Sequence, residues 1–138
     1  MIVRPHSILL DSEALSALAA GERRMHAWAT VARRTDSILY TSTITLAEVT
    51  DGTARDVAVR RTAKAVRLEP VSEPIGYQAG ALRAGAAARR RKPRDLTVDA
   101  VVAATALMLP PPVVVLTSDQ SDLRLLLTGT PVLVEQIG

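Results

Sequence analysis

Four acidic residues, far apart in the sequence, stand where a parallel sheet would bring them to one edge. Asp11 directly follows the apolar run SILL, and Asp119 lies two residues beyond the run VVVLT. Glu48 and Asp99 lie near the start of segments with a helical pattern. Ionised carboxylates gathered in a dry pocket repel one another, and a hard divalent cation with oxygen ligands relieves that repulsion. Mg²⁺ fits such a site best.

Each of these acids also has an explanation that involves no chemistry. Asp11 and Asp119 stand where the N-cap of a helix is expected. Thr45 and Glu48 have the spacing of a capping box, and Asp99 could complement a helix dipole. The occurrence of all four acids at one expected edge favours a metal site. The segment that begins near Asp99 is apolar nearly all round and should be buried, so the surroundings of these acids should be dry.

The composition excludes several other kinds of site. The chain of 138 residues has no cysteine, which excludes a disulfide scaffold and a thiolate zinc site. Its two histidines, His6 and His26, are too few for an imidazole metal cage. Hydrophobic residues make up 48% of the chain, enough for one domain with a substantial core.

Charge and aromatic content limit the kinds of partner. The net charge is +3, and most of the basic residues are arginine, which binds phosphate in a bidentate fork. Aromatic residues make up only 2% of the chain, so there are few side chains on which bases could stack. A nucleic acid would therefore be held mainly through its backbone.

The sequence predicts no membrane segment. Residues 101–118 carry no charge, but prolines at positions 110, 111 and 112 interrupt this stretch, and each half is too short to cross a bilayer. There is no long apolar leader near Met1. We therefore expect a cytoplasmic protein with no membrane partner.

Short apolar runs alternate with segments of helical pattern, which is typical of a parallel sheet with helices on both faces. We expect a three-layer α/β fold with a parallel five-stranded sheet, in one domain over residues 1–138. The expected strands are Ser7–Leu10, Ser37–Tyr40, Val66–Pro70, Val113–Thr117 and Pro131–Val134. In such sheets ligands bind beyond the carboxyl ends of the strands, which is where the acids fall.

Four stretches of the chain together resemble a known family. SILLDSEAL, STITLAEVT, LTVDAVVAATAL and VLTSDQSDLRLL are similar to the acidic blocks of PIN-domain ribonucleases, particularly the VapC-type toxins of bacterial toxin–antitoxin pairs. The blocks occur in the expected order and span nearly the whole chain. Each is loose alone, but the ordered set is fairly specific. The resemblance implies a PIN-like fold.

The resemblance also implies roles for individual residues. Asp11, Glu48, Asp99 and Asp119 would form the catalytic quartet, with Asp11, Asp99 and Asp119 as metal ligands. Asp122 would be an accessory acid, and Thr117 and Ser118 could hydrogen-bond a water on the metal.

The activity implied is Mg²⁺-dependent hydrolysis of RNA phosphodiester bonds, with Mn²⁺ as an alternative cofactor. The protein would be the endoribonuclease toxin of a type II toxin–antitoxin pair, held inactive by a cognate antitoxin and forming a homodimer. The basic run that contains Arg89, Arg90 and Arg91 could guide the RNA backbone, or could be a solvated loop and helix end.

Two other functions remain open from the sequence. A catalytically silent PIN-like module could bind RNA or protein without cutting. A receiver-type signalling domain also has clustered aspartates on a parallel sheet, but needs an aspartate where Glu69 stands and a lysine after the last strand, where PVLVEQIG has none.

Overall fold

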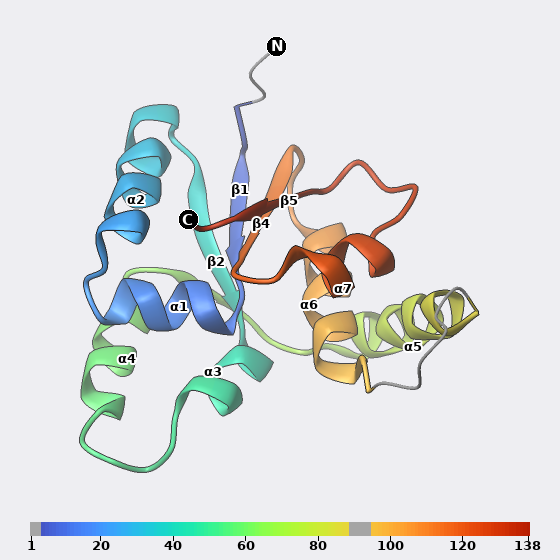
Figure 1. Cartoon of the computed structure of the whole chain (residues 1–138), viewed down its shortest axis with the longest axis horizontal. Helices are drawn as coiled ribbons and strands as arrows, with labels where there is room; N and C mark the ends of the chain where they lie inside the picture. Colours follow the sequence, from blue (N-terminus) through green and yellow to red (C-terminus); the bar gives the residue numbers. More distant parts are fainter. Residues whose placement is uncertain (1–3, 89–94) are drawn as a thin grey trace.

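The computed structural model describes residues 4–88 and 95–138 and contains the predicted parallel sheet (Figure 1). Within these residues the sheet has five strands in the order β3-β2-β1-β4-β5, all paired in parallel. The strands are β1 (Ser7–Leu10), β2 (Ile38–Ser42), β3 (Arg67–Glu69), β4 (Val113–Thr117) and β5 (Leu133–Gln136). The predicted fold class is confirmed.

The two central strands are apolar because both faces of the sheet are covered. Every residue of β1 and of β4 is buried, and the two strands pair directly, with Leu10 opposite Leu116. The edge strands have less cover: Leu68 on β3 and Leu133 on β5 are exposed. The hydrophobic driving force therefore fixes the centre of the sheet most strongly.

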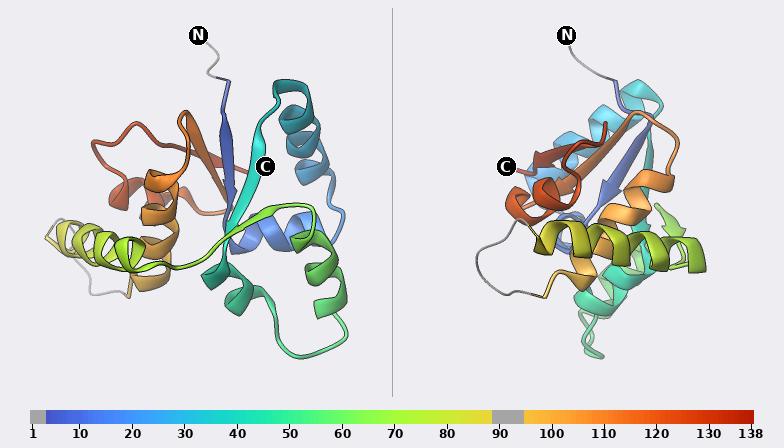
Figure 2. Two further views of the ribbon diagram at one scale, coloured as in Figure 1. Left: turned by 180° about the vertical axis from the view of Figure 1, so that it is seen from behind. Right: turned by 90° about the vertical axis from the view of Figure 1, so that its right-hand side faces the viewer.

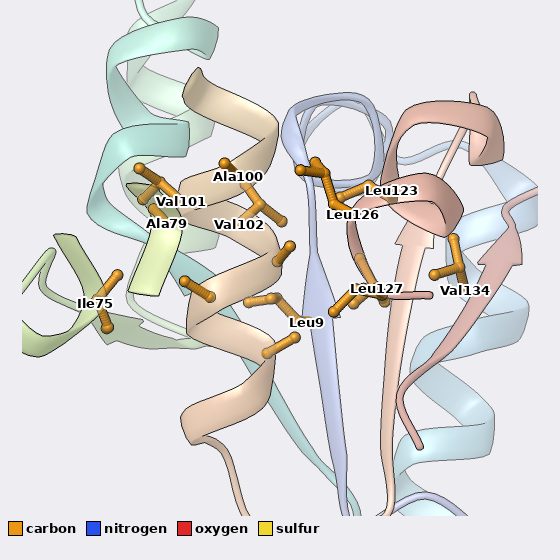
Figure 3. Close-up of a cluster of buried hydrophobic side chains, with 14 of the residues drawn as sticks. Leu9, Ile75, Ala79, Ala100, Val101, Val102, Leu123, Leu126, Leu127 and Val134 are labelled. Atoms are coloured by element: carbon orange, nitrogen blue, oxygen red, sulfur yellow. The ribbon is translucent and has the colours of Figure 1, made fainter. Parts of the chain in front are cut away.

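Helices form a layer on each face of the sheet (Figure 2). They are α1 (Ser12–Ala19), α2 (Arg23–Thr35), α3 (Thr43–Val49), α4 (Asp56–Ala63), α5 (Glu73–Ala87), α6 (Thr97–Met108) and α7 (Gln120–Leu126). Side chains of α1 and α2 pack with Ile8 and Leu10 of β1, and α3 and α4 pack against α1. Side chains of α5, α6 and α7 pack with Leu9 on the opposite face (Figure 3).

Three strands differ from the sequence prediction in their bounds. β3 is one residue shorter at each end than the predicted Val66–Pro70. β2 continues past Tyr40 to Ser42, because Thr41 and Ser42 pair with β3. β5 begins at Leu133 instead of Pro131. The hydroxyl of Thr130 accepts a hydrogen bond from the Val132 N–H (3.4 Å), so these residues belong to the turn that leads into the strand.

The strand order excludes a receiver-type domain. Receivers have the order 2-1-3-4-5, in which the third strand lies beside the first. Here β1 lies between β2 and β4, and β3 lies at an edge. The apolar stretch from residue 101 to residue 118 is divided between α6 and β4. Among the described residues, no helix is long and apolar enough to span a bilayer.

The central position of Leu9 leads to a stability prediction. Its side chain is completely buried on β1, and alanine would leave a cavity. We expect Leu9→Ala to lower the unfolding free energy by ~2–5 kcal/mol. Leu133→Ala, on an edge strand where the side chain is 40% exposed, is the matched control and should cost clearly less. Urea denaturation measures both, and equal losses would contradict the assignment of the core.

Candidate functional site

The acids lie at the edge formed by the carboxyl ends of the strands, at the point where the strand order reverses. The chain proceeds from β1 to β2 and β3 on one side of the sheet, whereas β4 and β5 lie on the other side of β1. The Asp11 N–H donates to the carbonyl of Leu116 (3.1 Å), which places Asp11 at the carboxyl ends of both central strands. α1, α3, α6 and α7 all begin at this edge (Figure 1). Crevices of this kind are the usual ligand sites of parallel sheets.

Asp11 is both a helix cap and a partly buried acid. Its carboxylate accepts a hydrogen bond from the Ala14 N–H (3.0 Å) as the N-cap of α1, which confirms the capping interpretation. Burial raises the pKa of Asp11, and hydrogen bonds from the Thr117 hydroxyl and from backbone N–H groups offset part of this effect. The cap role and a ligand role are compatible, because a carboxylate has several lone pairs.

Glu48 has no capping role. The N-cap of α3 is Ser42, whose hydroxyl accepts from the Ile44 N–H (3.2 Å), so the capping box expected from Thr45 and Glu48 is wrong. Glu48 is exposed, yet desolvation raises its pKa, and the negative charges of Asp99, Asp11 and Glu13 raise it further. The negative charges of Asp11, Glu13 and Asp99 therefore all act on the Glu48 carboxylate, although they come from different segments.

Asp99 is the third residue of α6 and is half-buried. The residues that follow it, from Ala100 to Ala106, are all buried, as the apolar pattern predicted. The turn before the helix is held by Asp95, whose carboxylate accepts from the N–H (2.9 Å) and the hydroxyl (2.7 Å) of Thr97. Asp99 thus lies directly before the buried part of α6.

Asp119 follows β4 at the same edge and is the N-cap of α7. Its carboxylate accepts from the N–H (3.1 Å) and the hydroxyl (2.8 Å) of Ser121. Thr117 is buried, and its hydroxyl accepts from the Asp119 N–H (3.1 Å). The same hydroxyl donates to the Asp119 carbonyl (3.0 Å). Its interaction with the Asp11 carboxyl lowers the pKa of Asp11.

The remaining predicted residues lie around this point. Asp122 is buried in the first turn of α7. Ser118 is half-buried between β4 and Asp119, and its carbonyl accepts from the side-chain amide of Gln136 (3.3 Å). The predicted substrate-binding residues, Arg89, Arg90 and Arg91, lie outside the described residues, so that assignment stays a prediction.

The chemistry of these side chains fits a hard divalent cation. Carboxylate oxygens are the ligands that Mg²⁺ prefers. Desolvation contributes most to the raised pKa of Glu48, and the charges of Asp99, Asp11 and Glu13 add a repulsion that a cation would relieve. Over residues 4–88 and 95–138, no three acidic or histidine side chains already form a group able to hold a metal ion. A metal would thus have to draw these side chains closer together.

Comparison with known proteins agrees with this geometry. A model of the PIN domain matches residues 8–121. The chain belongs to the PIN-domain family. No curated protein sequence matches it significantly. The matched residues include Asp11, Glu48, Asp99 and Asp119, whereas Asp122 falls just beyond them.

Solved structures share the PIN fold at low sequence identity. The VapBC2 complex of Rickettsia felis bound to promoter DNA has a chain with a TM-score of 0.74 at 12% identity, covering 94% of this chain and 98% of that one. FitAcB from Neisseria gonorrhoeae has a TM-score of 0.64 at 23% identity, covering 91% of this chain and 96% of that one. A toxin–antitoxin complex from Klebsiella pneumoniae has a TM-score of 0.62 at 22% identity, covering 91% of this chain and 95% of that one.

Two residues take part in this site in ways that the sequence did not predict. Glu13, in the first turn of α1, adds its charge to the field on Glu48. Thr45 is completely buried in α3, and its hydroxyl has no hydrogen-bond partner among the described residues. Only the position of Glu13, two residues after Asp11, could have suggested its effect, and the spacing of Thr45 and Glu48 suggested a cap instead.

The raised pKa of Asp11 predicts how stability depends on pH without metal. The folded state keeps this proton to higher pH than the unfolded state, so the unfolding free energy falls as pH rises between the ordinary and the raised pKa. Asp11→Asn removes this penalty and retains the cap, because asparagine caps as well as aspartate. We expect its melting temperature at pH 7 in EDTA to exceed that of the wild type by a few degrees, with the difference disappearing in acid.

Asp51→Asn is the matched control for this experiment. Hydrogen bonds from the hydroxyl and N–H of Thr53 lower the pKa of Asp51, so its charged form is favoured in the folded state. This substitution should therefore not raise the melting temperature at pH 7. A lower melting temperature for Asp11→Asn than for the wild type would show that the Asp11 carboxylate stabilises the fold.

Proposed function

We propose that residues 1–138 form one PIN-like domain that is the toxin of a type II toxin–antitoxin pair and a Mg²⁺-dependent endoribonuclease. The observation that carries the proposal is the common field of Asp11, Glu48 and Asp99, which come from three separate segments of a PIN fold. Acids that repel one another at a ligand-binding edge destabilise the folded protein, and a bound cation would offset this repulsion.

Asp11 and Asp99 are the metal ligands that we assign first, and Asp119 would bind directly or through water. When bound, Mg²⁺ or Mn²⁺ would lower the pKa of a water molecule and neutralise charge that develops on the phosphate. Thr117 would orient this group, since its hydroxyl donates to the Asp119 carbonyl, accepts from the Asp119 N–H and lowers the pKa of Asp11. Ser118 and Asp122 would complete the surroundings from β4 and α7.

Glu48 is the residue that we assign to accept a proton. Its carboxylate is exposed, has no capping role, and its pKa is raised towards the range in which a general base works best. As water attacks phosphorus, Glu48 would take its proton while the bond from phosphorus to the leaving oxygen of the RNA breaks.

The partners we propose are RNA, a cognate antitoxin and a second copy of the chain, in the cytoplasm. The likeness to chains of solved VapBC and toxin–antitoxin complexes supports the antitoxin. A groove of about 550 Å³ offers it a surface, with Ala29, Ile38 and Val66 among the apolar lining residues. Arg33 and Lys64 also line this groove, so an antitoxin segment with acidic residues would suit it.

Replacing Asp99 tests the proposal directly. We expect Asp99→Asn to lower the rate of Mg²⁺-dependent RNA cleavage by at least about a hundredfold, because one charged ligand is lost. Asp95→Asn, on the same segment, keeps its hydrogen bonds to Thr97 and should cleave RNA like the wild type. If the wild type cuts no RNA with either Mg²⁺ or Mn²⁺, the alternative of a silent binding module is favoured.

Metal binding should also appear as added thermal stability. A ligand that binds only the folded state raises the unfolding free energy, by about 2.7 kcal/mol at a hundredfold excess over Kd. We expect Mn²⁺ to raise the melting temperature of the wild type more at pH 7.5 than at pH 5, because the acids must be deprotonated to bind. Asp11→Asn should show a smaller increase. Equal increases at the two pH values would argue against binding through these acids.

A further inference from the structure

One buried polar atom lies beside the acidic site without a hydrogen bond. Thr45 is 0% exposed, and among the described residues its hydroxyl is the buried side-chain oxygen that has no partner. Burying a hydroxyl without a hydrogen bond destabilises the folded state. Such an atom in a native protein calls for an explanation, and functional sites are a common one.

Other threonines, three within helices and one at the C-cap of α3, make a hydrogen bond that the Thr45 hydroxyl does not make. The hydroxyls of Thr30, Thr35, Thr50 and Thr105 each donate to the carbonyl four residues earlier, at distances of 2.6–3.0 Å. This backbone hydrogen bond is the usual way in which a helix satisfies threonine. Thr45 does not make it, although the corresponding carbonyl belongs to Thr41 at the end of β2.

The position of Thr45 places it next to Glu48. The two residues are three apart on α3, so they share a face of the helix. Side chains on a helix lean towards its N-terminus, which brings the Glu48 carboxylate back over the turn that contains Thr45. Thr41, four residues before Thr45, donates through its hydroxyl to the Leu10 carbonyl (2.9 Å), which anchors this end of β2 beside the residue before Asp11.

Repulsion among the acids opposes a hydrogen bond between this hydroxyl and a carboxylate. Glu48 lies in the field of three other acids and is exposed, whereas the Thr45 hydroxyl is buried. A divalent cation would remove this repulsion and allow the carboxylates to approach one another. The carboxylate of Glu48 would then be the nearest strong acceptor on the same helix face.

We infer that Thr45 is a positioning residue whose hydroxyl donates to the Glu48 carboxylate when the acids close around a divalent cation. The inference rests on the proposed function. It assigns to Thr45 the role of holding the general base in one orientation, at the cost of an unpaired hydroxyl in the metal-free state. Hydrogen bonds of this kind typically change metal affinity or activity by about 10–100-fold.

Thr45→Val and Thr45→Ser separate this role from a structural one. Valine has nearly the same shape but no hydroxyl, whereas serine keeps the hydroxyl. In EDTA we expect Thr45→Val to melt at the wild-type temperature or above it, because an unpaired hydroxyl is removed. The same variant should bind Mn²⁺, followed by the electron spin resonance of the free ion, roughly tenfold more weakly. Thr45→Ser should bind Mn²⁺ like the wild type.

A matched control and a double mutant complete the test. Thr105→Val removes a hydroxyl that is hydrogen-bonded to the Val101 carbonyl (2.7 Å), so it should melt lower and leave Mn²⁺ affinity unchanged. In a Glu48→Ala background, Thr45→Val should have no further effect on Mn²⁺ affinity, because the acceptor is gone.

The outcomes distinguish the inference from the function on which it rests. If the wild type binds Mn²⁺ and Thr45→Val binds it equally well, the positioning role is overturned while the nuclease proposal stands. A Thr45→Val variant that melts below the wild type in EDTA would show a structural role and would also overturn the inference. If the wild type itself binds no Mn²⁺, the proposed function fails, and the role of Thr45 fails with it.

Discussion

The repulsion between carboxylates at one edge of the sheet is the constraint around which this molecule is organised. β1 and β4 are buried on both faces, so charged side chains can be placed next to these strands only where the strands end. Parallel pairing brings those ends to the same edge, and Asp11 is joined there to the Leu116 carbonyl. The fold thus buries and brings together charges that would be solvated and separate in the unfolded chain. Desolvation, and to a smaller extent neighbouring negative charges, raise the pKa of Asp11 and of Glu48.

Helix starts at this edge reduce that cost without removing it. Asp11 and Asp119 each accept hydrogen bonds from backbone N–H groups as N-caps, and the positive ends of helix dipoles favour their charged forms. Glu48 has no such support, because Ser42 caps its helix. The two explanations considered for the acids, caps and metal ligands, are therefore not exclusive. Capping prepares a carboxylate for a cation by fixing its position while leaving lone pairs available.

Much of this arrangement could be predicted from the sequence because the central strands have a simple signal. Runs such as VVVLT are apolar since no face is exposed, and their bounds agree with the structure. The edge strands carry a weaker signal, so β5 was placed too early, at Pro131. The cap of α3 was assigned wrongly because spacing alone cannot show where β2 ends. The effect of Glu13 on Glu48 depends on the contact between two segments that are distant in the sequence. The spacing of Thr45 suggested a cap, a role that the structure gives to Ser42.

The contrast between Thr45 and Thr105 shows how stability and chemistry are divided in this PIN domain. Both are completely buried helix threonines, yet only Thr105 has its hydroxyl satisfied by the backbone. Thr105 lies in the apolar part of α6, whereas Thr45 lies one turn before Glu48 at the acidic edge. The unpaired hydroxyl of Thr45 and the repulsion between the acids around Glu48 both destabilise the folded protein. In the role inferred for Thr45, a cation that brought the acids together would offset both costs at once.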